Sequence, residues 1–202
     1  MSDNKSQLQT QELFRSHNGY LRMSEAIQSG ITRYMLYSLR DSGIVEQVSR
    51  GVFRLAECPT PGNPDLVIVG LKYPKAVICL LSALAFHDLT TQIPNRVEVA
   101  LPRKSRRPTL DFPPLSVHRF SRHAYSFGIE EHELDGVPLK IYSPEKTIAD
   151  CFKFRNKIGM DVVLEALKLY KAAGKPDIAG LLEAAKACRV KNVMLPYLEA
   201  IL

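Results

Sequence analysis

The stretch Ser29–Leu55, SGITRYMLYSLRDSGIVEQVSRGVFRL, decides the fold of the chain. Gly30 permits a sharp turn, and Thr32 is a suitable N-cap because its hydroxyl accepts a hydrogen bond from a helical N–H. Gly43 is placed to end the helix in the left-handed conformation. β-Branched runs then flank Ser49-Arg50-Gly51, which predicts a tight hairpin with an arginine at its tip. The stretch therefore predicts a turn, a short helix and a β-hairpin.

The predicted helix separates apolar and polar residues at helical spacing. The apolar face holds Ile31, Met35, Leu36 and Leu39, and the opposite face holds Arg33, Tyr34, Tyr37, Arg40 and Asp41. An arginine can pair with guanine, and a tyrosine can reach a phosphate or lie on a thymine methyl group. The polar face is either a DNA-contacting surface or an ordinary solvated one. Two exposed tyrosines favour DNA contact, whereas Asp41 opposes it.

The residues before this stretch complete a helix-turn-helix. A polar helix is expected over Ser6–Ser16, and a second one over Met23–Ser29 packs through Met23, Ala26 and Ile27. Only Gly30 and Ile31 separate this helix from the next, which is the spacing of a helix-turn-helix. The hairpin adds a wing, whose Arg50, with Arg54 behind it, suits phosphate or minor-groove contact. The alternative for the wing is a solvated turn.

A linker is expected after the wing, because residues 58–64 hold three prolines and a glycine. The predicted domains are therefore a winged helix-turn-helix over residues 1–57, a linker over 58–64 and a C-terminal domain over 65–202. The predicted fold class is α+β, with the winged helix-turn-helix followed by a mixed α+β domain that ends in a helical bundle.

The C-terminal domain mixes strand and helix patterns. Asp65–Leu71 is either a buried strand or the start of a helix, and Pro74–Phe86 has helical spacing. Strands are expected over Arg96–Leu101 and Leu115–Phe120, and a hairpin over Gly128–Leu134 and Val137–Tyr142 around Asp135-Gly136. Ser143 and Pro144 open a helix. The last predicted helices are Asp161–Ala173, Lys175–Cys188 and Asn192–Leu202.

Composition excludes several classes of protein. With 46% hydrophobic residues the chain is not disordered, and no apolar run is long enough to span a membrane. The N-terminus lacks the apolar core of a signal peptide, and the four scattered cysteines suggest reduced thiols in the cytoplasm. Residues 1–57 carry seven Lys/Arg against six Asp/Glu, although the whole chain carries +6. The cluster Arg103–Arg107 is the main basic feature, and it is either a second DNA contact or a charged, solvated loop.

Three segments resemble the AbiEi family of antitoxins and transcriptional regulators. They are Tyr20-Leu21-Arg22-Met23 together with Ser29–Leu55, SALAFHDLTTQIPNRVEVALPR at Ser82–Arg103, and IYSPEKTIADCFKFRNKIG at Ile141–Gly159. The resemblance implies a bacterial DNA-binding antitoxin that represses its own operon by binding inverted repeats in double-stranded DNA, with two copies bound. It further implies that the chain counters a nucleotidyltransferase-like toxin in a type IV (abortive infection) system, in which the two proteins need not bind each other.

Two other interpretations of the function stay open. The chain is either a solitary winged-helix transcriptional regulator or a protein-docking module whose winged helix binds a partner protein instead of DNA. In the family's third segment, Glu145, Lys146 and Asp150 have capping and helix-surface pairing as their simplest role. A direct antitoxic role of that helix is the alternative.

Catalytic and metal-binding patterns are not found in the sequence. The five histidines are scattered without a cysteine or carboxylate at metal-ligand spacing, and there is no GxSxG elbow or phosphate loop. Glu98-Val99-Ala100 lacks the lysine of a nuclease motif. We therefore expect no enzyme activity, no cofactor and no metal. The residues expected to contact DNA are Thr32, Arg33, Tyr34, Tyr37, Arg40, Arg50, Arg54, Arg103, Lys104, Arg106 and Arg107.

Overall fold

The structure of the chain, a computed structural model, describes residues 2–59, 62–174 and 176–201, with side chains from Leu8 onward. Its contacts define two compact units. The first unit contains residues 1–74 together with 110–113 and 133–138. The second contains residues 75–109, 114–132 and 139–202.

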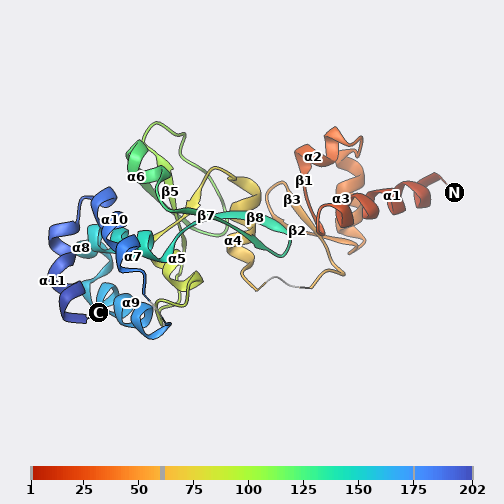
Figure 1. Cartoon of the computed structure of the whole chain (residues 1–202). Coiled ribbons are helices and arrows are strands. Elements are labelled where there is room, and N and C mark those ends of the chain that lie inside the picture. The colour runs from red at the N-terminus through yellow and green to blue at the C-terminus, as the bar shows by residue number, and fades with distance from the viewer. Residues whose placement is uncertain (1, 60–61, 175, 202) are drawn as a thin grey trace. The chain divides into compact units, whose positions relative to one another are not determined.

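The first unit is a winged helix-turn-helix extended by one further helix (Figure 1). Its elements are α1 (Ser2–Ser16), β1 (Tyr20–Arg22), α2 (Met23–Gln28), α3 (Arg33–Asp41), β2 (Val45–Ser49), β3 (Val52–Leu55) and α4 (Pro64–Lys72). The strands form an antiparallel sheet in the order β1-β3-β2. Phe14, Leu36 and Phe53 are among the fully buried residues of its core. The predicted helix-turn-helix and wing are therefore present.

Helix α4 resolves the ambiguity over Asp65–Leu71 in favour of a helix. Pro64 occupies its first turn, where the missing N–H of proline costs no hydrogen bond. Leu66–Gly70 are all buried, which is why the run shows no amphipathic period. Val67 packs with Tyr20 and Val137 in a small cluster of its own within the first unit.

The second unit contains a mixed five-stranded sheet in the order β6-β5-β4-β8-β7. Its strands are β4 (Val77–Ile78), β5 (Val97–Pro102), β6 (Leu115–Phe120), β7 (Ile129–Leu134) and β8 (Val137–Tyr142). Strand β4 pairs antiparallel with β5 and parallel with β8, and β5 pairs parallel with β6. The strands expected over Arg96–Leu101 and Leu115–Phe120 are thus found, as is the hairpin around Asp135-Gly136. Residues 133–138 at its tip count with the first unit.

The expectation of one helix over Pro74–Phe86 is wrong. The chain instead forms the short strand β4 and then α5 (Leu80–Phe86), with Cys79 extended and Leu80 at a φ of 48°. Ala76–Leu80 are all buried. A run that is apolar on every side carries no period, so helix and strand could not be separated there.

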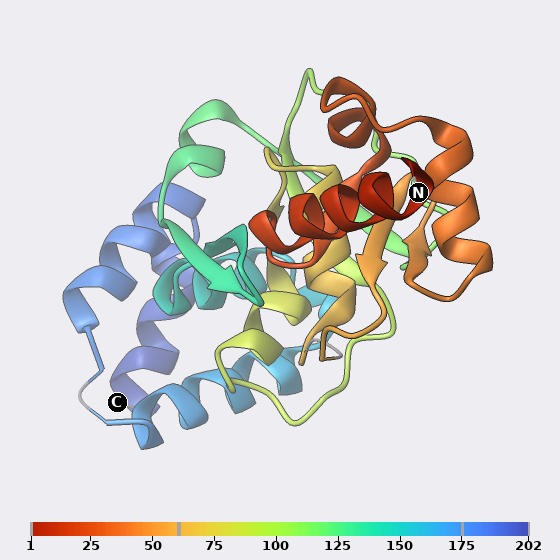
Figure 2. The same cartoon turned by 90° about the vertical axis from the view of Figure 1, so that its right-hand side faces the viewer.

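The second unit contains six further helices among the described residues. They are α6 (Arg122–Ser126), α7 (Pro144–Lys153), α8 (Arg155–Ile158), α9 (Met160–Ala172), α10 (Ile178–Cys188) and α11 (Lys191–Ile201). Helix α7 contacts α5, α9, α10 and α11, and the C-terminal helices lie together in both views (Figures 1 and 2). Ser143 caps α7 by accepting a hydrogen bond from the Lys146 amide, as expected.

Lys146 and Asp150 do not lie on the surface of α7 as expected. Both side chains are fully buried and form an ion pair, and the Cys188 thiol donates to the second Asp150 oxygen at 3.1 Å. The Lys146 ammonium also lies 4.0 Å from the centre of the Tyr142 ring. Burial raises the pKa of the Asp150 carboxyl, and the Lys146 charge opposes this rise.

The domain limits 1–57, 58–64 and 65–202 stay a prediction. Contacts group α4 with the winged helix-turn-helix, so the first unit runs on to Pro74. Within the expected linker, residues 60–61 lie outside the described residues, as do Lys175 and Leu202 at ends of two expected helices. No described helix is long and apolar enough to cross a membrane.

Candidate nucleic-acid interface

Helix α3 is fixed at both ends by local hydrogen bonds. The Thr32 hydroxyl accepts a hydrogen bond from the Met35 amide at 3.2 Å, which caps the N-terminus as expected. At the other end, the Gly43 amide donates to the Arg40 carbonyl and the Ile44 amide to the Leu39 carbonyl, both at 3.0 Å. This pair of bonds is a Schellman motif, with Gly43 in the left-handed conformation that glycine favours. The helix therefore presents its side chains from a defined frame.

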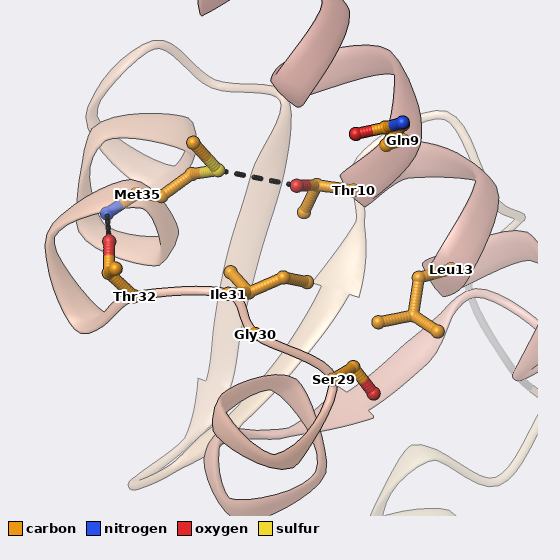
Figure 3. Close-up of a pocket in the computed structure, with 8 residues that line it drawn as sticks. All are labelled: Gln9, Thr10, Leu13, Ser29, Gly30, Ile31, Thr32 and Met35. Carbon is orange, nitrogen blue, oxygen red and sulfur yellow. Dashed lines mark hydrogen bonds between the residues drawn. The ribbon is translucent and has the colours of Figure 1, made fainter.

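The turn before α3 is held against α1. Figure 3 shows Ser29, Gly30 and Ile31 leading into α3 opposite Thr10 and Leu13 of α1. A cavity of about 420 Å³ is lined by residues of this turn, of α1 and of α3. The Thr10 hydroxyl on α1 donates to the Met35 sulfur at 3.3 Å. Ile31 is buried, and its amide donates to the Ala26 carbonyl of α2. These contacts fix the position at which α3 begins.

Arg33 and Tyr34 project from the first turn of α3 into solvent. Tyr34 is 84% exposed, an unusual position for a large aromatic side chain, and Arg33 is exposed beside it. On the opposite face Leu36 and Leu39 are fully buried in the core. The separation of faces expected from the sequence is thus present. The N-terminal turn is also the part of a recognition helix that reaches base edges in helix-turn-helix proteins.

Tyr37 and Arg40 belong to the same face but are held by neighbours. The Tyr37 ring stands edge-on to Phe53 with the centroids 6.2 Å apart, and the Arg40 guanidinium lies 4.8 Å from the Tyr37 ring centre. Arg40 donates from Nε and Nη2 to Asp41, at 2.9 and 2.8 Å, and from Nη1 to Gln47 at 3.4 Å. Asp41 therefore offsets part of the positive charge that Arg40 brings to this face.

Arg50 lies at the tip of the wing, as expected. It is exposed, and Gly51 after it has a φ of 75°, which closes the two-residue turn between β2 and β3. The Met23 amide donates to the Gly51 carbonyl at 2.9 Å and ties the turn to the start of α2. Lys72 on α4 donates to the Ser49 hydroxyl at 3.4 Å. Burial lowers the pKa of Lys72; the Asp111 charge opposes this shift, and the Arg50 charge adds a smaller lowering.

Arg54 has a different environment from the one expected. Its side chain is only 8% exposed, and it donates to Glu46 through Nη2 and to the Pro59 carbonyl through Nη1, each at 2.9 Å. Arg54 and Glu46 are direct partners across the β2–β3 ladder. A buried and paired guanidinium is not placed to contact DNA, so its part in the wing is structural.

The cluster Arg103–Arg107 follows β5 in the second unit. Arg103, Lys104, Arg106 and Arg107 are all exposed, and the turn is held by bonds from the Arg103 amide to Phe120 and from the Ser105 amide to Pro102. Four exposed positive side chains on one short segment have the charge and exposure that phosphate contacts require.

The sequence did not identify Lys72 or Gln47 as neighbours of the candidate interface. Only the packed structure brings Lys72 to Ser49 in the wing and Gln47 to Arg40.

One group of residues in the second unit resembles a catalytic triad by composition. His118 lies 3.3 Å from Ser116 Oγ and 3.3 Å from Glu98 Oε1. Both contacts involve the same Nε2 atom, whereas a relay needs one partner on each ring nitrogen. Glu98 also accepts a hydrogen bond from the Leu81 amide at the start of α5. Within the described chain, no group of three or more histidine, cysteine or acidic residues is arranged to hold a metal.

Comparison with known proteins supports the assignment of the first unit. Residues 9–56 match the family model described as "Transcriptional regulator, AbiEi antitoxin", so the resemblance to the AbiEi family is confirmed over this segment. That family is a regulatory one. No curated protein matches the chain. Among solved structures, the RV2827C protein from Mycobacterium tuberculosis is similar, with a TM-score of 0.48 and 14% identity over 87% of this chain and 78% of that chain.

Proposed function

We propose that the chain is a DNA-binding autorepressor and the antitoxin of a type IV toxin–antitoxin system. It binds inverted repeats upstream of its own operon, with two copies bound, and it counters a nucleotidyltransferase-like toxin without catalysis, cofactor or metal, in the cytoplasm. The observation that carries the proposal is the first turn of α3, where Arg33 and Tyr34 face solvent within the segment that matches the AbiEi regulators.

The structure supports different roles for the proposed contacts, some reading bases and others binding phosphates. Arg33 and Tyr34, with the Thr32 hydroxyl and the more constrained Tyr37 and Arg40, form the part that reads bases. Arg50 at the wing tip is suited to phosphate or minor-groove contact, because its charge is exposed and its backbone is fixed. Residues 1–57 carry almost no net charge, so Arg103, Lys104, Arg106 and Arg107 supply much of the electrostatic affinity.

A protein-docking module is the second candidate, and one observation favours it. Tyr34 is 84% exposed on a helix whose domain is nearly neutral, and exposed aromatic residues are enriched at protein interfaces. Salt dependence separates the two candidates. DNA binding weakens steeply as salt rises because counterions are released, whereas docking through an apolar surface is nearly insensitive to salt. A solitary regulator shares the DNA chemistry and differs in lacking an adjacent toxin gene.

The proposal is tested by a reporter gene placed behind the DNA upstream of this gene. The chain should lower reporter expression, and the double variant Arg33→Ala, Tyr34→Ala should restore it while the protein level stays equal. Co-expression with the adjacent gene should relieve that gene's toxicity. Full repression by the double variant would contradict the assignment of α3, and unrelieved toxicity would contradict the antitoxin part.

A further inference from the structure

A cavity in the second unit is lined by charged side chains of both signs. Its volume is about 230 Å³. Sites for drug-sized ligands usually measure roughly 300–1,000 Å³, so this cavity suits a smaller molecule, about the size of one free amino acid. Its walls come from α5, the loop before β5, β5 itself and α8, and the residues used below are Leu81, Pro94, Arg96, Glu98, Lys157 and Ile158.

Glu98 places a recessed carboxylate in the wall of this cavity. Its side chain is 13% exposed, its Oε2 atom accepts a hydrogen bond from the Leu81 amide at 2.8 Å, and its Oε1 atom lies 3.3 Å from His118 Nε2. His118 balances the carboxylate charge only when its ring is protonated. A carboxylate offers about four acceptor positions, so these two partners leave room for a further donor. A cationic donor would also compensate the charge of Glu98.

Arg96 and Lys157 bring positive charge to the same cavity. Both side chains are exposed, and neither forms an ion pair with a described carboxylate. Arg96 donates from Nε to the Asn95 side-chain oxygen at 3.1 Å, and the Lys157 ammonium lies 5.9 Å from the centre of the Phe154 ring. An anionic group of a ligand can therefore approach both cations without displacing an internal counterion.

The two signs of charge select the class of ligand. A purely anionic ligand would face Glu98, and a purely cationic one would face Arg96 and Lys157. An α-amino acid carries an ammonium and a carboxylate on one carbon atom and has no net charge. It therefore offers each charged wall an opposite partner within a molecule small enough for the cavity.

The rest of the wall is aliphatic. Leu81, Pro94 and Ile158 line the cavity, and Leu81 and Ile158 are half-buried against the core of the second unit. An aliphatic side chain placed here loses contact with water, which adds to the affinity in proportion to the apolar area that is buried. The wall therefore favours an amino acid with an aliphatic side chain.

We propose that this cavity binds a free aliphatic α-amino acid such as leucine. The ligand ammonium donates to the Glu98 carboxylate, and the ligand carboxylate accepts hydrogen bonds from Arg96 and Lys157. The ligand side chain packs against Leu81 and Ile158. None of the residues proposed to contact DNA lines the described part of the cavity, so the site does not depend on the proposed function.

Nuclear magnetic resonance titrations of the full chain test the site with leucine and two analogues. Isocaproate lacks only the ammonium of leucine, and isoamylamine lacks only its carboxylate. Leucine should give saturable shifts of the backbone amide signals of Leu81, Glu98 and Ile158. Each analogue should bind at least about tenfold more weakly, because it loses the hydrogen bonds of one charged group.

Two variants should change the preference among these probes in opposite ways. Lys157→Gln should weaken the binding of leucine and isocaproate several-fold and should not weaken that of isoamylamine. Glu98→Gln keeps an oxygen acceptor for the Leu81 amide and removes the charge. It should weaken leucine and isoamylamine but not isocaproate. The probe that each variant still binds shows that the variant is folded.

Lys168→Gln is the matched control, because it removes an exposed positive charge from α9 in the same unit and should leave leucine binding unchanged. The proposal is overturned if leucine gives no saturable shift at the three amides. It is also overturned if either analogue binds as tightly as leucine, which would show an apolar cleft without charge recognition. Unchanged leucine affinity in Lys157→Gln or Glu98→Gln would overturn it as well.

Discussion

Arg33, Arg40 and Arg54 show how one side chain takes different parts within a single small unit. Arg33 is exposed on the first turn of α3, Arg40 is held by Asp41 and Gln47, and Arg54 is buried against Glu46. Of the three, Arg33 is therefore the one best placed for the base contact that we propose, because Arg40 and Arg54 would first have to give up internal bonds. To contact DNA, Arg40 must either break its hydrogen bonds to Asp41 or carry the Asp41 carboxylate towards the DNA phosphates.

Replacing Arg33 by alanine should therefore weaken operator binding by about 1–3 kcal/mol and relax the preference for the operator sequence. Arg40→Ala should cost less, because the bonds to Asp41 that it already makes offset part of its gain on DNA. Mobility-shift titrations measure both. Lys168→Ala is the matched control, since it removes one exposed positive charge from α9 in the second unit. A larger effect for Arg40→Ala than for Arg33→Ala would contradict this order.

At the scale of elements, α3 depends on its caps for the orientation of its first turn. Thr32→Ala removes the acceptor for the Met35 amide and should lower the stability of the first unit by about 0.5–2 kcal/mol. Denaturant unfolding followed through the tyrosines of this unit measures the change. Thr32→Ser keeps the acceptor and should restore most of the stability. Equal stability of the alanine and serine variants would show that the cap contributes nothing.

Helix α7 depends on the buried pair formed by Lys146 and Asp150. Lys146→Met leaves a carboxylate buried without its cation, which should cost about 3–5 kcal/mol. The double variant Lys146→Met, Asp150→Leu removes both charges and should be more stable than the single variant. Thermal unfolding measures the order of the two. A single variant as stable as the unmodified chain would contradict the buried ion pair.

The elements that the sequence predicted well are those with a clear period or a local cap. Helix α3 combined both signals, and the turns at Gly51 and Gly136 fixed two hairpins. The segment that was predicted wrongly and the one that was left open share one physical cause, which is burial on all sides. Ala76–Leu80 and Leu66–Gly70 are apolar throughout, so their spacing could not separate strand from helix. Lys146 and Arg54 are buried charges, and only the packed structure shows the partners that permit this.

The exposure of the candidate site could be predicted from the sequence only where the site lies on one helix. The exposure of Arg33 and Tyr34 followed from helical spacing alone. The bond from Arg40 to Gln47 and the approach of Lys72 to Ser49 connect elements that are distant along the chain. No spacing rule places such pairs together, so the sequence could not show which arginines of the face are already engaged.

For the whole molecule, the proposed function places most of the electrostatic affinity for DNA in the second unit and sequence selection in the first, because the charge of the chain is uneven. Replacing Arg103, Lys104, Arg106 and Arg107 together by glutamine should reduce the slope of log affinity against log salt by up to about 0.9 for each phosphate that the variant no longer neutralises. The ratio of operator to non-operator affinity should stay nearly constant, because phosphate contacts carry no sequence information. An unchanged slope would show that the cluster is a solvated turn.

The most direct test of site selection by α3 is the ratio of affinities for the upstream DNA of this gene and for a scrambled duplex of the same length and composition. The unmodified chain should prefer its own DNA by at least about a thousandfold at physiological salt. The double variant Arg33→Ala, Tyr34→Ala should reduce this ratio towards one while binding to the scrambled duplex persists. Equal binding of the unmodified chain to both duplexes would contradict the claim that α3 selects the site.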